Sequence, residues 1–227
     1  MENINFIFPE IFISLSVMFL LVFGVFKKNS SNIVYSLTVI SLIVALALII
    51  NLPANYETFL FDNSYKIDRL SNFMKIITII SGIFVLICSY DYTKLEKLSN
   101  IEYPILIMCS ILGMIVMISS YDLIVFYIGL ELQSLALYVL AAFDKNNVKS
   151  SEAGLKFFIL SALSSGLMLY GFSLIYGFSG TTNFDLISQS ILSSDNKNVF
   201  GLVFILVGLA FKISAVPFHM WAPDVYE

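Results

Sequence analysis

Long apolar runs alternate with short polar stretches along the whole chain. Several of these runs exceed the roughly 18 apolar residues that mark a membrane-spanning helix. The core of a single soluble domain does not contain repeated apolar runs of this length. The pattern therefore predicts an all-α, polytopic transmembrane protein. The expected helices are seven, at residues 4–26, 33–52, 68–90, 103–119, 121–143, 152–178 and 198–216.

The connections between these runs are polar or rich in turn-forming residues, and all are short. We therefore expect no domain outside the membrane. The boundary between the fourth and fifth runs is the least sharply marked. The connections are Lys27 to Asn32, Pro53 to Ser64, Tyr92 to Glu102, Asp144 to Ser151, and Ser179 to Asn198.

Composition supports this reading, because 59% of the residues are hydrophobic and only 12% are charged. Lipid must therefore be the main solvent. The basic residues form no contiguous patch that would suit nucleic acid, despite a net charge of −4. Cys88 and Cys109 lie inside apolar runs without metal-ligand spacing, so we expect small buried side chains and neither a disulfide nor a metal site.

Charge in the loops predicts the orientation. Six lysines lie in alternate connections on one side, against three basic residues on the other, which favours an N-terminus outside the membrane. The first run begins after Glu2, without a basic segment, and has no small-residue cleavage site before Lys27. We therefore expect a retained helix and no cleaved signal peptide.

Glu131 lies halfway along the fifth run, where an ionisable group costs roughly 2.5–3.5 kcal/mol on the translocon scale. Tyr127, Glu131, Ser134 and Tyr138 recur at helical spacing and form one polar stripe. That stripe should face protein or water. A functional role is favoured, although a glutamate can also hold neighbouring helices together.

Lys212 lies near the end of the seventh run, with Gly208 one turn earlier to leave space beside its long side chain. Pro217 and Pro223 cannot continue a helical hydrogen-bond ladder, so we predict a helix that breaks within the membrane and resumes afterwards. Such a break would place Lys212 deep. At an ordinary helix end, the same lysine would reach the interface.

Two further groups are candidates for proton transfer. Lys156 follows Glu152 at i+4, which favours an ion pair and is equally compatible with an ordinary interfacial salt bridge. His219 is the only histidine, and imidazole titrates near neutral pH, although a lone histidine is often a packing residue. Lys75, Asp68 and Arg69 lie near the start of the third run, and we assign them to the membrane interface.

A glutamate and a lysine held together away from lipid can act as a proton switch. Changing their separation or their access to water alters how readily the lysine holds its proton, and the pair then titrates as one unit. Such a mechanism requires no cofactor. We predict that Glu131 and Lys212 are the principal couple.

Three segments resemble the subunit N (NADH dehydrogenase subunit 2) branch of the Mrp-antiporter-like family of respiratory complex I. The resemblance covers essentially the whole chain and is most specific in the last seventeen residues. The segments are residues 129–135 (GLELQSL), 151–158 (SEAGLKFF) and 211–227 (FKISAVPFHMWAPDVYE).

By this resemblance, Glu131, Lys156, Lys212 and His219 match the family's proton-translocating residues. It implies no cofactor on this chain, with NADH, FMN, iron–sulfur clusters and quinone on other subunits. The implied partners are other complex I membrane subunits, neighbouring antiporter-like subunits among them. The implied location is the bacterial plasma membrane or the mitochondrial inner membrane.

The resemblance also divides the chain into residues 1–102, with the first three helices, and residues 103–227, with the first antiporter-like repeat. The family continues through a second, inverted repeat, and this chain ends before it. A separately encoded C-terminal half would then be a partner as well. Two other functions stay open, namely a freestanding cation/proton antiporter component and a structural scaffold whose buried charges only fix helix packing.

Overall fold

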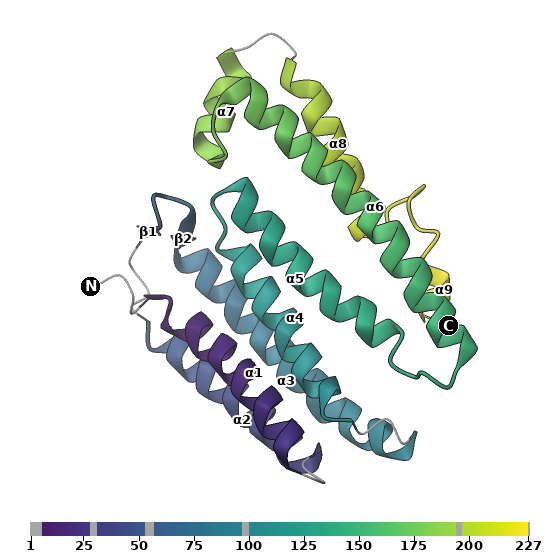
Figure 1. The fold of residues 1–227 in the computed structure, drawn as a ribbon. Coiled ribbons are helices and arrows are strands. Elements are labelled where there is room, and N and C mark those ends of the chain that lie inside the picture. Colours follow the sequence, from purple (N-terminus) through teal and green to yellow (C-terminus); the bar gives the residue numbers. More distant parts are fainter. Residues whose placement is uncertain (1–5, 28–30, 53–56, 97–99, 194–196, 227) are drawn as a thin grey trace. The chain divides into compact units, whose positions relative to one another are not determined.

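The computed structural model describes residues 6–27, 31–52, 57–96, 100–193 and 197–226 (Figure 1). Helices dominate these residues, and each of the seven predicted runs contains one. The elements are α1 (Phe8–Phe26), α2 (Ser31–Ile50), β1 (Thr58–Leu60), β2 (Tyr65–Ile67), α3 (Arg69–Leu95), α4 (Glu102–Ile118), α5 (Leu123–Ala141), α6 (Val148–Ser179), α7 (Phe184–Ser193), α8 (Lys197–Lys212) and α9 (Ala222–Tyr226).

The prediction of a polytopic helical membrane protein is confirmed. Within the described residues, α1, α2, α3, α5 and α6 are long and apolar enough to cross a membrane, and α4 and α8 are shorter apolar helices. The boundary between the fourth and fifth runs also lies where the sequence placed it, since α4 ends at Ile118 and α5 begins at Leu123.

Two elements lie in connections that the sequence left without structure. Strands β1 and β2 form an antiparallel hairpin between α2 and α3, with Phe59 opposite Lys66. Phe61, Asp62 and Asn63 take left-handed backbone conformations, which close the turn. The second addition is α7, a ten-residue helix in the predicted connection after α6. Both are much shorter than the apolar runs from which the helices were predicted.

Several helix ends also differ from the prediction, and in two cases the helix is longer than predicted. Helix α3 continues to Leu95, beyond the predicted end at residue 90, and α6 begins at Val148, four residues before the predicted start at 152. At α6 the reason is local, because the side chain of Asn147 caps the helix by accepting from the backbone N–H of Lys149. At these two ends, polar residues that we assigned to the connections form part of the helix.

The chain forms two compact units. The first unit is residues 1–120 together with 128–137, and the second is residues 121–127 together with 138–227. Helix α5 therefore contributes its middle to the first unit and its ends to the second. The predicted division at residue 102 follows the family's repeats and stays a prediction.

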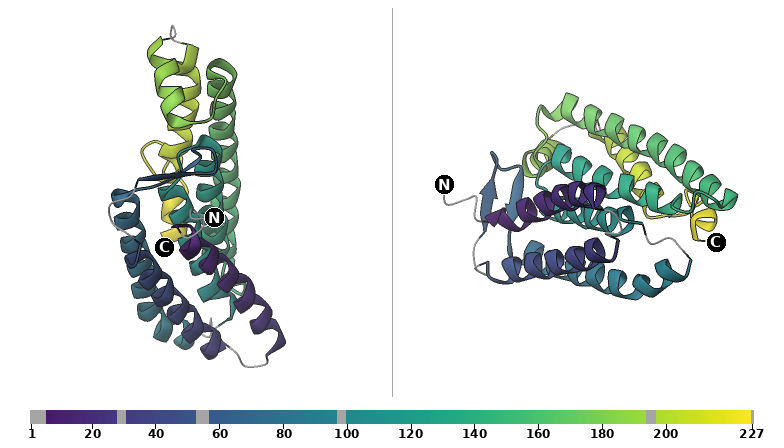
Figure 2. Two further views of the ribbon diagram at one scale, coloured as in Figure 1. Left: turned by 90° about the vertical axis from the view of Figure 1, so that its left-hand side faces the viewer. Right: turned by 60° about the horizontal axis from the view of Figure 1, so that its bottom comes forward.

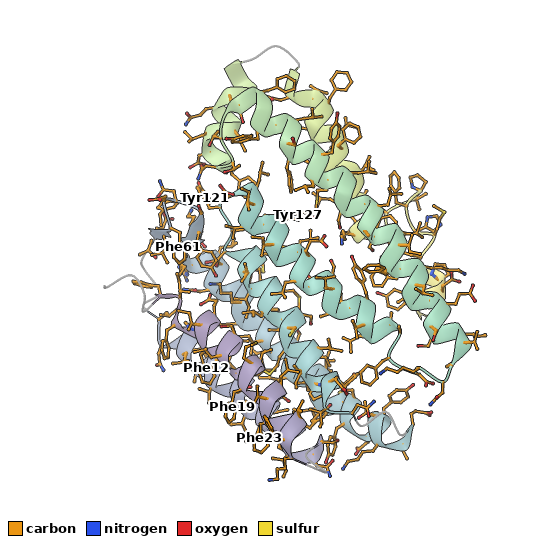
Figure 3. The ribbon with its side chains drawn as sticks, in the orientation of Figure 1. Phe12, Phe19, Phe23, Phe61, Tyr121 and Tyr127 are labelled. Atoms are coloured by element: carbon orange, nitrogen blue, oxygen red, sulfur yellow. The ribbon has the colours of Figure 1, made fainter. Side chains whose placement is uncertain are left out.

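In the first unit, α1 packs against α2 and α4, and α3 packs against α2 and α4 (Figures 1 and 2). Buried positions recur along one face of each helix, for example Ile13, Val17 and Leu20 on α1. Outward-facing aromatic rings leave the other face apolar, and Phe19 and Phe23 stack along α1 with centroids 6.1 Å apart (Figure 3). This is the surface that lipid would cover.

Glycines let α4 approach the middle of α5 within the first unit. A Cβ atom built at Gly113 would lie 2.5 Å from the backbone nitrogen of Gln133, and one at Gly129 would lie 2.7 Å from the backbone nitrogen of Met117. Small residues allow such close backbone contact between membrane helices. Gly129, two residues before Glu131, therefore allows α5 to pack closely against α4.

In the second unit, α6 and α8 pack antiparallel along most of α8. Gly171 of α6 faces Gly201 of α8. Two turns earlier on α6, the hydroxyl of Ser164 donates a 3.1 Å hydrogen bond to the carbonyl oxygen of Gly208. A Cβ at Gly208 would lie 2.6 Å from the Cβ of Met168. Gly208 is thus required for contact with α6, a role different from the space beside Lys212 that we predicted for it.

Candidate functional site

The predicted helix break is present and begins earlier than Pro217. Helix α8 ends at Lys212, and the next residues leave the helical path, with Ser214 at φ 55°. The N–H of Ala215 donates to the carbonyl oxygen of Ala210 at 2.8 Å, a wide closing turn. The chain becomes helical again at Ala222, so Lys212 is the last helical residue before the break.

Aromatic side chains hold the broken segment against α6. The indole N–H of Trp221 donates to the carbonyl oxygen of Phe211 at 3.1 Å, and this bond links the two sides of the break. Trp221 also stacks on Phe157, with centroids 4.2 Å apart and planes 12° from parallel. Together with Tyr138, these residues form one buried cluster. The break is therefore packed and defined.

Lys212 reaches this cluster through Tyr138. Its ammonium nitrogen donates a 2.8 Å hydrogen bond to the Tyr138 hydroxyl and lies 5.4 Å from the ring centroid. Tyr138 itself is buried and packs edge-on against Phe157, with centroids 4.7 Å apart. The polar stripe of α5 therefore supplies a specific partner for the lysine, one that the sequence placed on the stripe without pairing it with Lys212.

Lys156 forms two ion pairs. The i+4 pair predicted with Glu152 is confirmed, with Nζ 2.8 Å from the carboxylate, and a second pair with Asp224 measures 2.9 Å. Asp224 comes from α9, so Lys156 links α6 to the segment beyond the break. Its side chain stays 45% exposed, which leaves it open to water.

A polar cavity of about 360 Å³ lies beside Lys156 in the second unit. It is large enough for several water molecules, each of which occupies roughly 30 Å³ in the liquid. Charged and amide groups line it, so water is a suitable occupant. Its lining residues include Asn147, Lys149, Ser150, Glu152, Lys156 and Asp224.

His219 lies in the irregular segment after the break, and its side chain is exposed. Its carbonyl oxygen accepts from the N–H of Ala222 at 3.1 Å, at the start of α9. The backbone of His219 thus helps to begin α9. Its role in proton transfer stays a prediction.

Glu131 lies in the middle of α5, in the first unit, and is half-buried. The stripe to which it belongs is the more buried face of the helix, since Ser134 and Tyr138 are buried while Leu135 and Val139 are about half exposed. This agrees with the prediction that the stripe faces away from lipid. The coupling of Glu131 to Lys212, which belongs to the second unit, stays a prediction.

The expected burial of the two cysteines is wrong. Cys88 on α3 is exposed and Cys109 on α4 is half-buried, because an apolar helix face needs no protein partner where lipid covers it.

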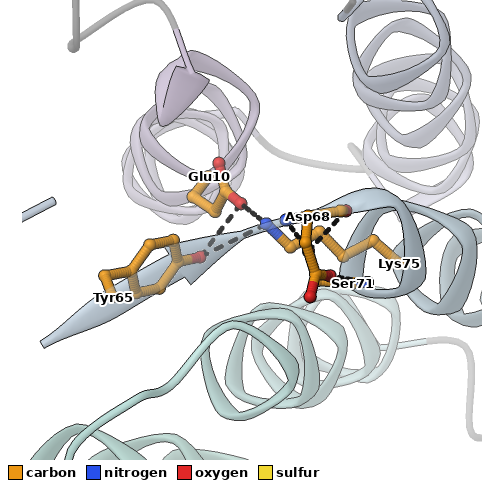
Figure 4. A network of polar contacts seen from close by, with 5 residues as sticks. All are labelled: Glu10, Tyr65, Asp68, Ser71 and Lys75. Carbon is orange, nitrogen blue, oxygen red and sulfur yellow. Dashed lines mark hydrogen bonds and ion pairs between the residues drawn. The ribbon is translucent and has the colours of Figure 1, made fainter. Parts of the chain in front are cut away.

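A second assignment from the sequence is also wrong. Lys75 does not reach the membrane interface, because its side chain is only 1% exposed and its ammonium lies 2.5 Å from the carboxylate of Glu10 (Figure 4). Asp68 is the N-cap of α3 and accepts from the N–H of Ser71, while Arg69 is exposed. An acidic residue inside the first apolar run was the available signal for a partner of Lys75.

The second unit therefore brings together groups that can donate and accept protons. Lysine ammonium groups donate, the tyrosine hydroxyl both donates and accepts, and carboxylates accept. Water in the polar cavity can exchange protons with Lys156, and Lys212 is held at a helix break. Within the described ranges, no group of three or more His, Cys, Asp or Glu side chains is arranged to hold a metal ion.

The antiparallel α6 and α8, the broken helix and the lysines define an antiporter-like helical membrane protein. Residues 120–227 match the family described as NADH:quinone oxidoreductase/Mrp antiporter, TM. The chain is a member of the NADH-quinone oxidoreductase subunit N family and corresponds to its N-terminal half.

Related sequences align with essentially the whole chain. The chain is 66% identical over 227 residues to NADH-quinone oxidoreductase subunit N of Pelagibacter ubique. The alignment covers 100% of this chain and 48% of the relative. It is 51% identical to subunit N of Bartonella bacilliformis, over 97% of this chain and 46% of the relative. The chain thus spans about half the length of the curated relatives it matches.

A solved structure shares the fold. A chain of respiratory complex I from Thermus thermophilus superimposes with a TM-score of 0.78 at 27% identity, over 96% of this chain and 47% of that one. The comparisons therefore confirm the family and the fold that the sequence resemblance implied. They also confirm that the chain matches the N-terminal half of its relatives. The chain is a multi-pass membrane protein.

Proposed function

We propose that this chain is part of a proton-translocating membrane subunit of NADH:quinone oxidoreductase. The observation that carries the proposal is the bond between Lys212 and Tyr138 at the break of α8. A lysine held there can pass a proton directly to water, or through the hydroxyl, which accepts one proton from the ammonium as it gives its own to a water molecule. The names of the relatives support the same activity.

Lys156 is the entry group in this proposal. Its exposed side chain borders the polar cavity, and its two carboxylate partners, Glu152 and Asp224, stabilise the protonated form. A proton arriving from water would replace one that Lys156 hands onward. Because the carboxylates come from two different helices, a shift of α9 changes how firmly the lysine holds its proton.

Lys212 is the central carrier, and Glu131 is proposed to control it. A carboxylate near an ammonium favours its charged form, so moving or screening the carboxylate favours release of the proton. His219 would receive or supply protons beyond the break. The rest of the path would run through the half of the relatives that residues 1–227 do not match.

The redox groups are proposed to lie elsewhere. NADH, FMN, iron–sulfur clusters and quinone would bind other subunits, and this chain would take its energy from them through conformational coupling. Its proposed partners are neighbouring antiporter-like subunits, other complex I membrane subunits and, where separately encoded, its C-terminal half. Co-purification with quinone oxidoreductase subunits separates this proposal from a freestanding cation/proton antiporter.

Lys212→Ala and Glu131→Ala test the proposed function in the assembled membrane complex. Both variants should assemble and show fewer protons translocated per electron than the unmodified complex. Lys145→Ala is the matched control, because Lys145 is exposed in the connection between α5 and α6. Normal stoichiometry in both variants would leave only a scaffold role for these two charges.

A further inference from the structure

The first unit contains a buried acid–base cluster that proton transport through Lys212 does not use. The ammonium of Lys75 and the hydroxyl of Tyr65 both donate to the same oxygen of Glu10, Oε1, at 2.5 and 3.0 Å (Figure 4). The three residues come from α3, β2 and α1. Their exposed fractions are 1% for Lys75 and 6% for Tyr65 and Glu10.

An ion pair is a costly way to join two membrane helices. Both charges lose their hydration, and two apolar side chains of similar size often stabilise a protein as well or better. Ionisable groups inside membrane-spanning segments are accordingly rare and usually functional. The first apolar run contains Glu10 as its only charged residue between Ile4 and Phe26, and that residue faces inward.

The two oxygens of Glu10 have different surroundings. Oε1 accepts hydrogen bonds from Lys75 and Tyr65, whereas Oε2 is buried and has no hydrogen-bond partner among the residues that the structure describes. A buried acceptor without a donor is unfavourable, and binding a proton there removes the charge that makes it so. Oε2 is therefore the atom where an additional proton would bind.

Tyr65 is suited to remain a donor throughout. Burial and the neighbouring charge of Glu10 raise the pKa of the Tyr65 hydroxyl far above its ordinary value, so this group stays protonated. It can hold Oε1 in place whether Glu10 is ionised or neutral.

We propose that Glu10 and Lys75, oriented by Tyr65, form a second proton-binding site, located in the first unit and outside the matched region of residues 120–227. A proton that binds Oε2 of Glu10 neutralises the carboxylate, and Lys75 then releases its own proton to water, so that no lone charge stays buried. Transfer of the proton from Glu10 to Lys75 restores the ion pair. This site extends the proposed proton transport and rests on it.

The Glu10→Gln/Lys75→Met double variant tests the proposal in the assembled complex. It removes both charges at similar side-chain size, so a pair with a purely structural role is replaced without leaving a lone charge behind. We expect normal assembly together with a loss of part of the protons translocated per electron. Normal assembly with normal stoichiometry overturns the proposal.

A second measurement decides the matter if the double variant does not assemble. Infrared difference spectra of the working complex should contain a band from the protonated carboxyl of Glu10, and Glu10→Asp should shift that band while keeping the ion pair. A spectrum with no band sensitive to Glu10→Asp overturns the proposal. Lys212→Ala separates the two ideas, because a pumping defect there beside a normal double variant refutes this site alone.

Discussion

The ammonium of Lys212 donates a 2.8 Å hydrogen bond to the hydroxyl of Tyr138, a residue 74 positions earlier in the chain. The lysine ends α8, and the tyrosine occupies the buried face of α5. Because the stripe that contains Tyr138 also contains Glu131, one helix carries both the hydroxyl that contacts the lysine and the carboxylate proposed to control it. The first prediction concerns this hydroxyl.

Tyr138→Phe should lower proton translocation several-fold without preventing assembly. The ring would still pack against Phe157, but the hydrogen bond from Lys212 to the hydroxyl would be lost, and a hydrogen bond to a charged group contributes roughly 1.5–3 kcal/mol. Proton translocation per electron and quinone-linked NADH oxidation are the measurements. Tyr170→Phe is the control, since Tyr170 is 54% exposed and packs edge-on against Phe204. Equal behaviour of the two variants would contradict a role for the Tyr138 hydroxyl.

Asp224→Asn should loosen α9 from α6. Lys156 would keep its pair with Glu152 but lose the bond that reaches across to α9. Hydrogen exchange of residues 222–226 should become faster than in the unmodified protein. Glu152→Gln removes a carboxylate from the same lysine while leaving the link to Asp224, so exchange in α9 should change little. The reverse order of the two effects would show that Asp224 does not hold α9.

Gly113→Ala should destabilise the first unit, by about 1–3 kcal/mol as is typical for an overpacked site. The added methyl group would lie 2.5 Å from the backbone nitrogen of Gln133, so α4 and α5 would have to separate. Thermal unfolding in detergent is the measurement. Gly166→Ala is the control, because a Cβ there meets nothing within 4 Å, and alanine is the better helix former. A Gly113→Ala protein as stable as the control would contradict the close packing.

Lys75→Met alone should destabilise the first unit more than the Glu10→Gln/Lys75→Met double variant does. Removing one partner of a buried pair leaves an uncompensated charge and typically costs about 3–5 kcal/mol, whereas removing both leaves none. Unfolding of the two variants by denaturant in detergent gives the comparison. Equal stability of the single and double variants would indicate that Glu10 finds water or another donor when Lys75 is absent.

The cap of α3 should depend on pH in a defined direction. Burial favours a higher pKa for Asp68, but hydrogen bonds from Ser71 and the charge of Lys66 outweigh it, so the pKa lies below its ordinary value. A lowered pKa in the folded state means that the stabilisation is present above the unfolded-state pKa and is lost as the pH falls through the folded-state value.

Hydrogen exchange at the start of α3 should therefore accelerate on acidification. Asp68→Ala should show fast exchange at neutral pH already, with a loss of about 1 kcal/mol that is typical of a missing N-cap. Asp68→Asn keeps an accepting oxygen without a titrating group, so it should retain slow exchange and lose the dependence on pH. An unchanged pH profile in Asp68→Asn would assign the effect to another residue.

Much of the site could be predicted from the sequence because its signals are local. The ion pair of Lys156 with Glu152 follows from i+4 spacing, and the break after Lys212 follows from nearby proline residues. Asp224 could not be found in this way. It lies 68 residues beyond Lys156 and meets it only because α9 folds back against α6.

The error at Lys75 has the same origin. Its position two turns into α3 is compatible with reaching the interface, and nothing near it in the sequence indicates otherwise. Its partner Glu10 is 65 residues away in the chain, with α2 and the β1–β2 hairpin between them. Gly208 is a similar case, because its neighbour Met168 belongs to another helix.

The sequence by itself determined the membrane-spanning helices, their order and the family, because hydrophobic length and motif spacing are properties of consecutive residues. Only the tertiary structure decided which charged and polar groups meet, namely Lys212 with Tyr138, Lys156 with Asp224, and Lys75 with Glu10. The physical reason is that a buried polar group must find its partner in space, and packing between distant helices selects that partner.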